Sequence, residues 1–579
     1  MLRKDIEVEI PDSKVRIKKQ NKNQYVYAVL GRAGDSKGNE KDVTREIGKV
    51  TREGFMNPND SYFKLYPDKD IHVIPTQPSS FDSQSKIGAV AALHSIAKKK
   101  GILDCLKLAF GEKDASLILS LASYYTIARD SAAMLYSDFM FDHYGIATET
   151  ASESAISRLF NKEMEIGKVD AFRSAYLKHC FTEAVKKRDG EKKEEKKKKT
   201  RLFVDLDSTN VNVSSENCTD AEYGKAKVDE GLPQINMAYF YDRSSGVPVF
   251  YDSFYGSITD ITHCTVGIKA MMDNLNQDSK NVCYDFILDR GYFSQKNMNS
   301  LRDGSISFAV MGKNTSVFSE YIRKHHDEIR SSVSLISVGS YGMRLKGKAF
   351  AKDDGPDYNI YLYFDSTKET EEKSGIEQKL LDAKKALKGK KEDRTGGLRR
   401  TYGNYLKIET EGEDDEIKSV ETNRESVDGM LSETGYFWIV STMEMEPAEM
   451  LRAYRERDEI EKSFRIVKSE SDLNKTYAQN NIALNAKLMM GFLTAILRGE
   501  LTAMTRKITE TKTNLSTQKM LLALDKIIMY QVNGHYALKY AYTALQQEIL
   551  KALDVEKSEI ESVITLWNSK DKDDDSIKH

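Results

Sequence analysis

The order of short β-rich runs between residues 201 and 310 constrains the fold of this chain more than any other feature. Three such runs follow one another, a helix comes next, and compact apolar strands complete the series. Strands that are followed by a helix and then by further strands are typical of an α/β domain. The predicted elements are strands at 202–207 and 211–213, 235–241 and 247–251, a helix at about 262–275, and strands at 282–289 and 306–310.

Two of these strands end in an aspartate. Asp207 closes the first strand, and Asp289 closes a strand whose preceding residues are nearly all apolar. A carboxylate at the C-terminal end of a buried strand lies where an open α/β sheet usually forms its site. Asp205 lies on the same strand face as Asp207, so it could share the site or replace Asp207. For any single aspartate, a turn or a helix cap is the alternative.

A third acidic residue, Glu461, lies on a predicted helix that starts at Pro447, a residue type that suits a first-turn position. At about 100° per residue, Glu461 shares one narrow stripe of this helix with three other residues. The stripe is Tyr454, Arg457, Glu461 and Lys468, at about 0°, −60°, −20° and −40°. A salt-bridged surface helix is the alternative interpretation.

These residue types suit one chemistry. Hydrolysis and transfer of a phosphodiester need an activated water or hydroxyl and a stabilised leaving oxygen, and two Mg²⁺ ions about 3.5–4 Å apart supply both. Mg²⁺ is bound by a few carboxylate oxygens, together with water and phosphate. Two aspartates from strands and one glutamate from a packed helix would suffice. Arg457 and Lys468 beside the glutamate would bind DNA phosphates.

The charge distribution agrees with this interpretation. The net charge is −2, but residues 201–300 hold 8 basic and 14 acidic residues, whereas residues 451–550 hold 15 basic and 10 acidic ones. An acidic block beside basic blocks suits a cation-binding centre flanked by surfaces for a polyanion. Chance variation in composition is the alternative.

Composition excludes several other classes. Five cysteines, an odd number without a CxxC pair, argue against a disulfide framework or a zinc finger and favour the cytosol. No apolar run approaches the roughly 18 residues of a membrane helix, so we expect no membrane partner. The first seven residues lack the apolar segment of a secretory signal.

The motifs resemble those of a known family. The stripe on the Glu461 helix resembles the Y-R-E-K signature of bacterial DDE transposases in the insertion-sequence-four superfamily. Residues 207–209 (Asp-Ser-Thr) resemble the first aspartate motif of that family, and residues 288–293 (Leu-Asp-Arg-Gly-Tyr-Phe) resemble the second. The resemblance covers most of the chain and is weakest across 314–430.

The resemblance implies a cut-and-paste DNA transposase of the bacterial cytosol, associated with the nucleoid. Such an enzyme binds terminal inverted repeats and target DNA, acts as a homodimer in a synaptic complex, and uses two Mg²⁺ (or Mn²⁺) ions. The implied metal-binding catalytic residues are Asp207, Asp289 and Glu461, and the implied contacts to DNA phosphates are Tyr454, Arg457 and Lys468.

Members with this signature can pass through a DNA hairpin, in which an aromatic side chain stacks on a flipped base. Trp438, on a predicted strand at 436–441, is a candidate for that role. A core position is the other interpretation, because Tyr436 and Val440 share its face of the strand.

We therefore predict an α/β fold with a ribonuclease-H-like catalytic core, an inserted β-rich subdomain, and mainly helical flanking regions. Two other functions stay open: a non-catalytic DNA-binding protein derived from a transposase, and a ribonuclease-H-like nuclease that acts without transposition. The expected division is 1–80, a small β-containing region; 81–200, a helical domain and charged linker that binds DNA; 201–313, the first part of the core; 314–434, the insertion; 435–475, the second part of the core; and 476–579, a C-terminal helical region with a disordered tail.

Overall fold

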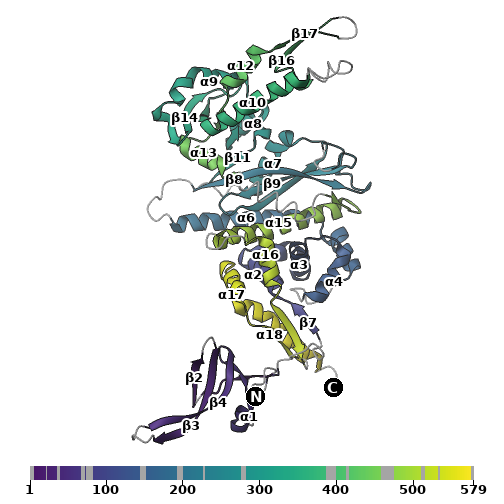
Figure 1. Ribbon diagram of the computed structural model, residues 1–579. Helices are drawn as coiled ribbons and strands as arrows, with labels where there is room; N and C mark the ends of the chain where they lie inside the picture. The colour runs from purple at the N-terminus through teal and green to yellow at the C-terminus, as the bar shows by residue number, and fades with distance from the viewer. Residues whose placement is uncertain are drawn as a thin grey trace. The chain divides into compact units, whose positions relative to one another are not determined.

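The computed structural model divides into two compact units. Unit 1 comprises residues 1–96, 135–150 and 507–579, and unit 2 comprises residues 97–134 and 151–506 (Figure 1). The structure describes residues 6–12, 14–20, 23–34, 40–66, 72–73, 83–143, 151–191, 200–225, 229–275, 282–386, 400–411, 416–457, 475–509, 515–532 and 535–575.

Unit 1 begins with an antiparallel sheet that has six strands among the described residues, in the order β2-β3-β4-β5-β1-β6. Apolar residues of alternating strand positions, including Val26, Ala28 and Ile47, form a small core under Tyr62 of helix α1. The elements are β1 (Ile6–Glu9), β2 (Val15–Gln20), β3 (Asn23–Gly34), β4 (Glu40–Arg52), β5 (Phe55–Pro58), α1 (Asp60–Leu65) and β6 (His72–Val73).

The rest of unit 1 joins both ends of the chain. Strand β20 pairs with β21, which follows it in the chain, and with β7, which precedes it by more than 400 residues of sequence. The C-terminal region expected to be helical thus also contains the strands β20 and β21, and its last helix, α18, extends to Asp575. The elements are β7 (Ser83–Lys86), α2 (Gly88–Lys99), α4 (Tyr136–Asp142), α16 (Thr517–Leu524), β20 (Ile528–Val532), β21 (His535–Leu538), α17 (Ala544–Ala552) and α18 (Lys557–Asp575).

Unit 2 is built on a mixed sheet of ten strands among the described residues, so the predicted α/β class is confirmed. The order is β10-β9-β8-β11-β12-β18-β15-β14-β13, with β19 paired to β8. Neighbours β8, β11 and β12 are parallel, β19 is parallel to β8, and the other neighbouring strands are antiparallel. The strands are β8 (Thr200–Val213), β9 (Gln234–Asp242), β10 (Val247–Tyr255), β11 (Val282–Leu288), β12 (Ser307–Met311), β13 (Leu335–Ser337), β14 (Ser340–Gly347), β15 (Tyr358–Asp365), β18 (Tyr436–Ser441) and β19 (Lys475–Thr476).

Helices cover both faces of this sheet, because its central strands are apolar on both sides. On one face the core includes residues of α6, α7, α8 and α9, and on the other it includes residues of α13. Figure 1 shows α6 and α15 running below β8 and β9. The helices of unit 2 are α3 (Ile102–Ala128), α5 (Glu153–Arg158), α6 (Ile166–Glu191), α7 (Asp260–Asn274), α8 (Gln295–Asp303), α9 (Ser316–Ile329), α10 (Ser366–Ala386), α12 (Arg424–Ser432), α13 (Pro447–Arg455) and α15 (Asn481–Thr509).

The region expected as an inserted β-rich subdomain is arranged differently. Its predicted strand pair forms β14 and β15, which extend the central sheet through β18, so this part is not a separate β subdomain. The stretch between β15 and β18 does have a small core of its own, formed by α10, α12 and the hairpin of β16 (Leu406–Glu411) and β17 (Glu416–Thr422). Residues 387–399 lie outside the described residues.

One helix in the described part of the chain is long and apolar enough to cross a membrane, namely α15 over Asn481–Thr505. Its most apolar window is 83% buried inside the structure. A core helix passes the same test, so α15 is weak evidence for a membrane span.

Candidate active site

Strand pairing brings the two predicted aspartates together. Strands β8 and β11 are parallel, and the last matched pair in their register is Leu206 with Leu288. Asp207 is the next residue of β8, and Asp289 is the residue directly after β11; neighbouring strands lie about 4.8 Å apart. One expectation is corrected: β8 continues to Val213, so Asp207 lies inside a strand, whereas Asp289 does follow the end of β11.

Both aspartates belong to the same face of the sheet. Leu206 and Leu288 point into the core beneath the opposite face. Side chains alternate along a strand, so Asp207 shares a face with Asp205, and Asp289 shares it with Ile287, which packs against α13. The two carboxylates therefore lie on the α13 face.

The two carboxylates differ in their partners. Asp289 is the N-cap of a short 3-10 helix and accepts a hydrogen bond from the Arg290 N–H at 2.7 Å. Its carboxylate is 47% exposed and lies 3.3 Å from Nη1 of Arg457. Asp207 is partly exposed and accepts a hydrogen bond from the Ser208 N–H at 2.9 Å. Both carboxylates are thus at least partly accessible to solvent.

Two of the four stripe residues lie at the end of β11, but only Tyr454 belongs to helix α13, which ends before Arg457. It begins at Pro447, as predicted, and ends at Arg455. The Tyr454 hydroxyl donates to the Leu288 carbonyl at 3.2 Å, and Arg457 contacts Asp289. Both side chains are buried. In this structure a contact of either one with a DNA phosphate would require these interactions to exchange.

The other two stripe residues, Glu461 and Lys468, lie outside the described residues. The chain leaves the described part after Arg457, beside Asp289, and returns at Lys475, where β19 pairs with Asn212 and Val213 of β8. Within the ranges that the structure describes, no three His, Cys, Asp or Glu side chains form a group that could hold a metal ion. The described part therefore contributes two carboxylates.

Asp205, the alternative to Asp207, is buried in an ion pair. It is 2% exposed and forms an ion pair with Arg243, whose Nε donates to Oδ2 at 2.9 Å. Burial raises the pKa of Asp205, although Arg243 and Arg457 act to lower it. The sequence analysis did not single out Arg243, because its pairing with Asp205 joins residues 38 positions apart.

Trp438 is a core residue and does not present its ring at the surface for a flipped base. It is fully buried, with Tyr436 and Val440 in the same core, as the second interpretation predicted. Its ring stacks on Phe318 with centroids 5.4 Å apart, and its Nε1 donates to the Lys313 carbonyl at 3.1 Å.

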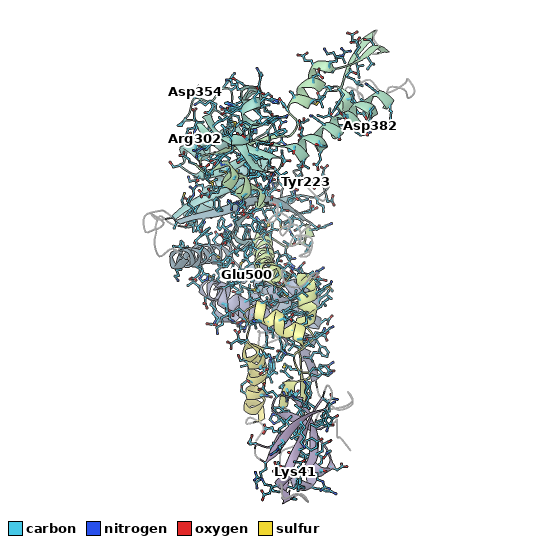
Figure 2. The ribbon with its side chains drawn as sticks, turned by 60° about the vertical axis from the view of Figure 1, so that its left-hand side comes forward. Lys41, Tyr223, Arg302, Asp354, Asp382 and Glu500 are labelled. Atoms are coloured by element: carbon cyan, nitrogen blue, oxygen red, sulfur yellow. The ribbon has the colours of Figure 1, made fainter. Side chains whose placement is uncertain are left out.

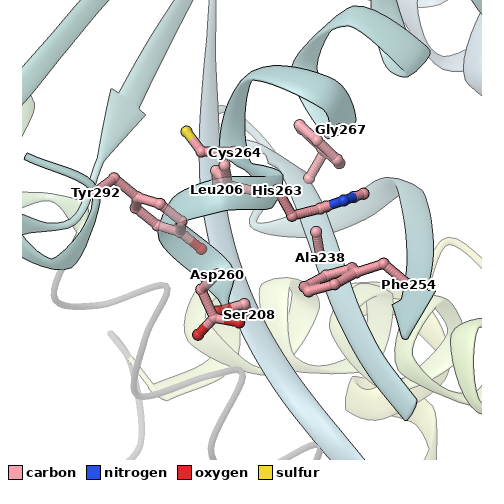
Figure 3. Close-up of a pocket in the computed structure, with 10 residues that line it drawn as sticks. Leu206, Ser208, Ala238, Phe254, Asp260, His263, Cys264, Gly267 and Tyr292 are labelled. Carbon is pink, nitrogen blue, oxygen red and sulfur yellow. The ribbon is translucent and has the colours of Figure 1, made fainter. Parts of the chain in front are cut away.

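Behind the two aspartates, on the opposite face of β8, lies a tightly packed hollow that is too narrow to admit a water molecule. Figure 3 shows the Tyr292 hydroxyl pointing toward Ser208 and Asp260. Burial raises the pKa of Tyr292 well above its ordinary value, against the effect of its hydrogen bond with Ser208. Ser208 directly follows Asp207, and Tyr292 lies three residues after Asp289. The hydrogen bond between Ser208 and Tyr292 therefore joins the two chain segments that carry the aspartates.

The arrangement agrees with a comparison of the sequence with protein families. Residues 198–497, more than half of the chain, match the transposase DDE domain family. The chain belongs to this family. The matched span includes β8, β11, α13 and most of α15, and hence both aspartates. The predicted identification as a DDE transposase is thereby confirmed at the level of the family.

The other comparisons add no argument. The search of curated proteins gives no match. A solved structure of the piggyBac transposase, in a synaptic complex with hairpin DNA, aligns with 80% of this chain and 85% of that chain. The alignment has 10% identity and a TM-score of 0.31, which is too weak a likeness for conclusions about this fold.

Proposed function

We propose that this protein is a cut-and-paste DNA transposase that cleaves DNA at terminal inverted repeats and joins the ends to target DNA. The observation that carries the proposal is that Asp207 and Asp289 directly follow the last matched pair of β8 and β11, Leu206 with Leu288, within the span of the DDE family match. We propose that its core is ribonuclease-H-like. From its Y-R-E-K spacing, we assign the protein to the bacterial insertion-sequence-four group.

The donor set fits a divalent metal. Asp207 and Asp289 offer partly exposed carboxylate oxygens on adjacent strands, which is the donor type that Mg²⁺ and Mn²⁺ prefer. These two residues, with Glu461, would hold a pair of ions. Bound there, the metal would activate the attacking oxygen and stabilise the leaving one.

The neighbouring residues have supporting roles in this proposal. Arg457 is ion-paired with Asp289, so its positive charge already lies where a phosphate would approach. Tyr454 ties the end of α13 to the end of β11 through the Leu288 carbonyl. Lys468 is proposed as a further phosphate contact. We propose that the enzyme acts as a homodimer, since two ends are cleaved, in the bacterial cytosol at the nucleoid.

The test compares three variants with a matched control on one DNA substrate. The substrate is a plasmid that carries the DNA flanking the gene on both sides, with Mg²⁺ or Mn²⁺ added. Asp207→Asn, Asp289→Asn and Glu461→Gln should abolish nicking at the element ends and keep DNA binding, because they remove metal ligands. Asp357→Asn is the control, since Asp357 is 49% exposed and pairs only with Lys348, at 3.0 Å, in the structure's ion pairs.

The outcomes separate the candidate functions. End-specific nicking and joining by the wild type that depends on the three acidic residues supports the proposal. Binding without any nicking would favour a non-catalytic DNA-binding protein. Nicking of unrelated DNA without joining would favour a ribonuclease-H-like nuclease. Loss of binding in Glu461→Gln would instead indicate that Glu461 is a structural residue.

A further inference from the structure

A buried arginine, Arg243, joins the strand that carries Asp207 to the helix that carries Tyr454. Its guanidinium contacts both carboxylate oxygens of Asp205, with Nε to Oδ2 at 2.9 Å. Its remaining nitrogen, Nη1, donates to the backbone carbonyl of Ala453 in α13. Arg243 itself lies in the turn between β9 and β10.

The surroundings hold this guanidinium in one place. The Arg243 side chain is 8% exposed, and the Asp205 side chain is 2% exposed. The guanidinium also lies over the Phe203 ring, 5.4 Å from its centroid. A planar fork can contact a carboxylate with one edge and a carbonyl with another nitrogen, which a lysine ammonium, as a compact point charge, cannot reproduce.

Both ends of this bridge lie next to candidate site residues. Asp205 precedes Asp207 by two residues on the same strand face. Ala453 immediately precedes Tyr454, and Arg457 follows the end of α13 by two residues. We infer that Arg243 is a positioning residue, which sets the distance between the aspartates on the sheet and the end of α13 that leads to Arg457. This inference rests on the proposed function for its effect on cleavage.

A second arginine of unit 2 provides a matched control. Arg302 of α8 contacts the buried Asp353 with Nη1 to Oδ2 at 3.2 Å, and donates from Nη1 to the Pro356 carbonyl at 3.0 Å. It also lies over the Tyr358 ring, 4.9 Å from its centroid. Arg302 thus has the same three kinds of partner as Arg243, but none of these partners belongs to α13. Figure 2 shows Arg302 close to Asp354, the neighbour of Asp353.

The experiment compares Arg243→Lys with Arg302→Lys in the full chain. Each variant keeps the positive charge and loses the fork. Three properties are measured: the melting temperature, binding of the plasmid fragment that carries the gene's flanking DNA, and the nicking rate at saturating DNA with Mg²⁺. A fourth is hydrogen exchange, read by mass spectrometry on the peptide of residues 447–457.

We expect Arg243→Lys to lower the nicking rate roughly 100-fold, the scale of a displacement of about 1 Å in a catalytic group, and to leave DNA binding unchanged. Exchange in 447–457 should become faster. Both variants should lower the melting temperature, and by similar amounts. Arg302→Lys should leave the nicking rate and the exchange in 447–457 unchanged.

Two results would overturn the inference. One is unchanged exchange in 447–457 for Arg243→Lys. The other is a loss of nicking that is equal in both variants and follows the melting temperature, because this indicates general destabilisation. If the wild type does not nick DNA at all, the proposed function fails, while the exchange measurement still decides whether Arg243 holds α13.

Discussion

Gly312 leaves no space for a side chain, and we predict that Gly312→Ala strongly destabilises unit 2. A Cβ atom at this position would lie 2.0 Å from Nε1 and 2.3 Å from Cε2 of Trp438. The indole is fully buried and stacks on Phe318, so it cannot move aside without losing contacts. Its hydrogen bond to the Lys313 carbonyl would break in the same movement.

The cost follows from these contacts. Overpacking of a well-packed core costs about 1–3 kcal/mol. Loss of a buried hydrogen bond costs about 1 kcal/mol, and loss of an aromatic pair costs about 0.5–1.5 kcal/mol. The expected destabilisation is therefore about 2.5–5.5 kcal/mol. At about 2 °C per kcal/mol for a large domain, the melting temperature of unit 2 should fall by roughly 5–11 °C.

The assay uses the protein's own fluorescence. The chain has two tryptophans, Trp438 and Trp567. In a Trp567→Phe background the emission therefore reports Trp438 alone, and its thermal transition is that of unit 2. Gly312→Ala should shift the emission of Trp438 to the red, because the displaced indole gains contact with water.

Gly375→Ala is the matched control. Gly375 lies in helix α10, and a Cβ there would meet no atom within 4 Å. Alanine is favoured over glycine inside a helix by about 0.5–1 kcal/mol, so this variant should be neutral or more stable. A melting temperature of Gly312→Ala equal to that of the parent protein, with unchanged emission, would refute the packing described for Trp438.

Two further predictions concern the site end of the sheet. Tyr454→Phe removes the hydrogen bond to the Leu288 carbonyl, so the free energy of unfolding should fall by about 1 kcal/mol. The nicking rate should fall by more than the loss of folded protein accounts for. A fall in nicking rate no larger than the loss of folded protein would contradict the positioning role of Tyr454. Burial acts to raise the pKa of Asp365, but hydrogen bonds from groups that include the Lys368 N–H, with the charge of Arg455, lower it overall. A lowered pKa stabilises the fold above about pH 4 and stops doing so as pH falls through the folded pKa. The melting-temperature deficit of Asp365→Ala should therefore be present at pH 7 and shrink below pH 4.

The sequence predicted the residue types of the site better than their arrangement. Asp289 was predictable, because its apolar strand and the glycine-containing exit are local features. The pairing of Asp207 with Asp289 depends on the register between β8 and β11, which are separated by some 80 residues, and no local pattern encodes that register.

Two errors have physical causes. Strand β8 was expected as two runs, 202–207 and 211–213, with a break at the polar residues Ser208 to Asn210. The Asn210 and Asn212 side chains are buried, and they donate to the carbonyls of Lys225 and Asp229, so the strand continues. Strand β20 was expected as helix because its neighbours are rich in leucine. Its pairing with β7 joins residues far apart in sequence, and such tertiary contacts override local propensity.

The return of the chain to the central sheet makes the stretch between β15 and β18 a closed excursion. Its first and last residues are neighbours, since the Asp365 N–H donates to the Gly435 carbonyl at 2.9 Å, and β15 pairs with β18. Strands β8 and β11, which lead to Asp207 and Asp289, pair directly with each other, and this pairing does not involve the excursion. The length and composition of this excursion can therefore change, by evolution or by replacement with a short turn, while the spacing of the two aspartates is preserved.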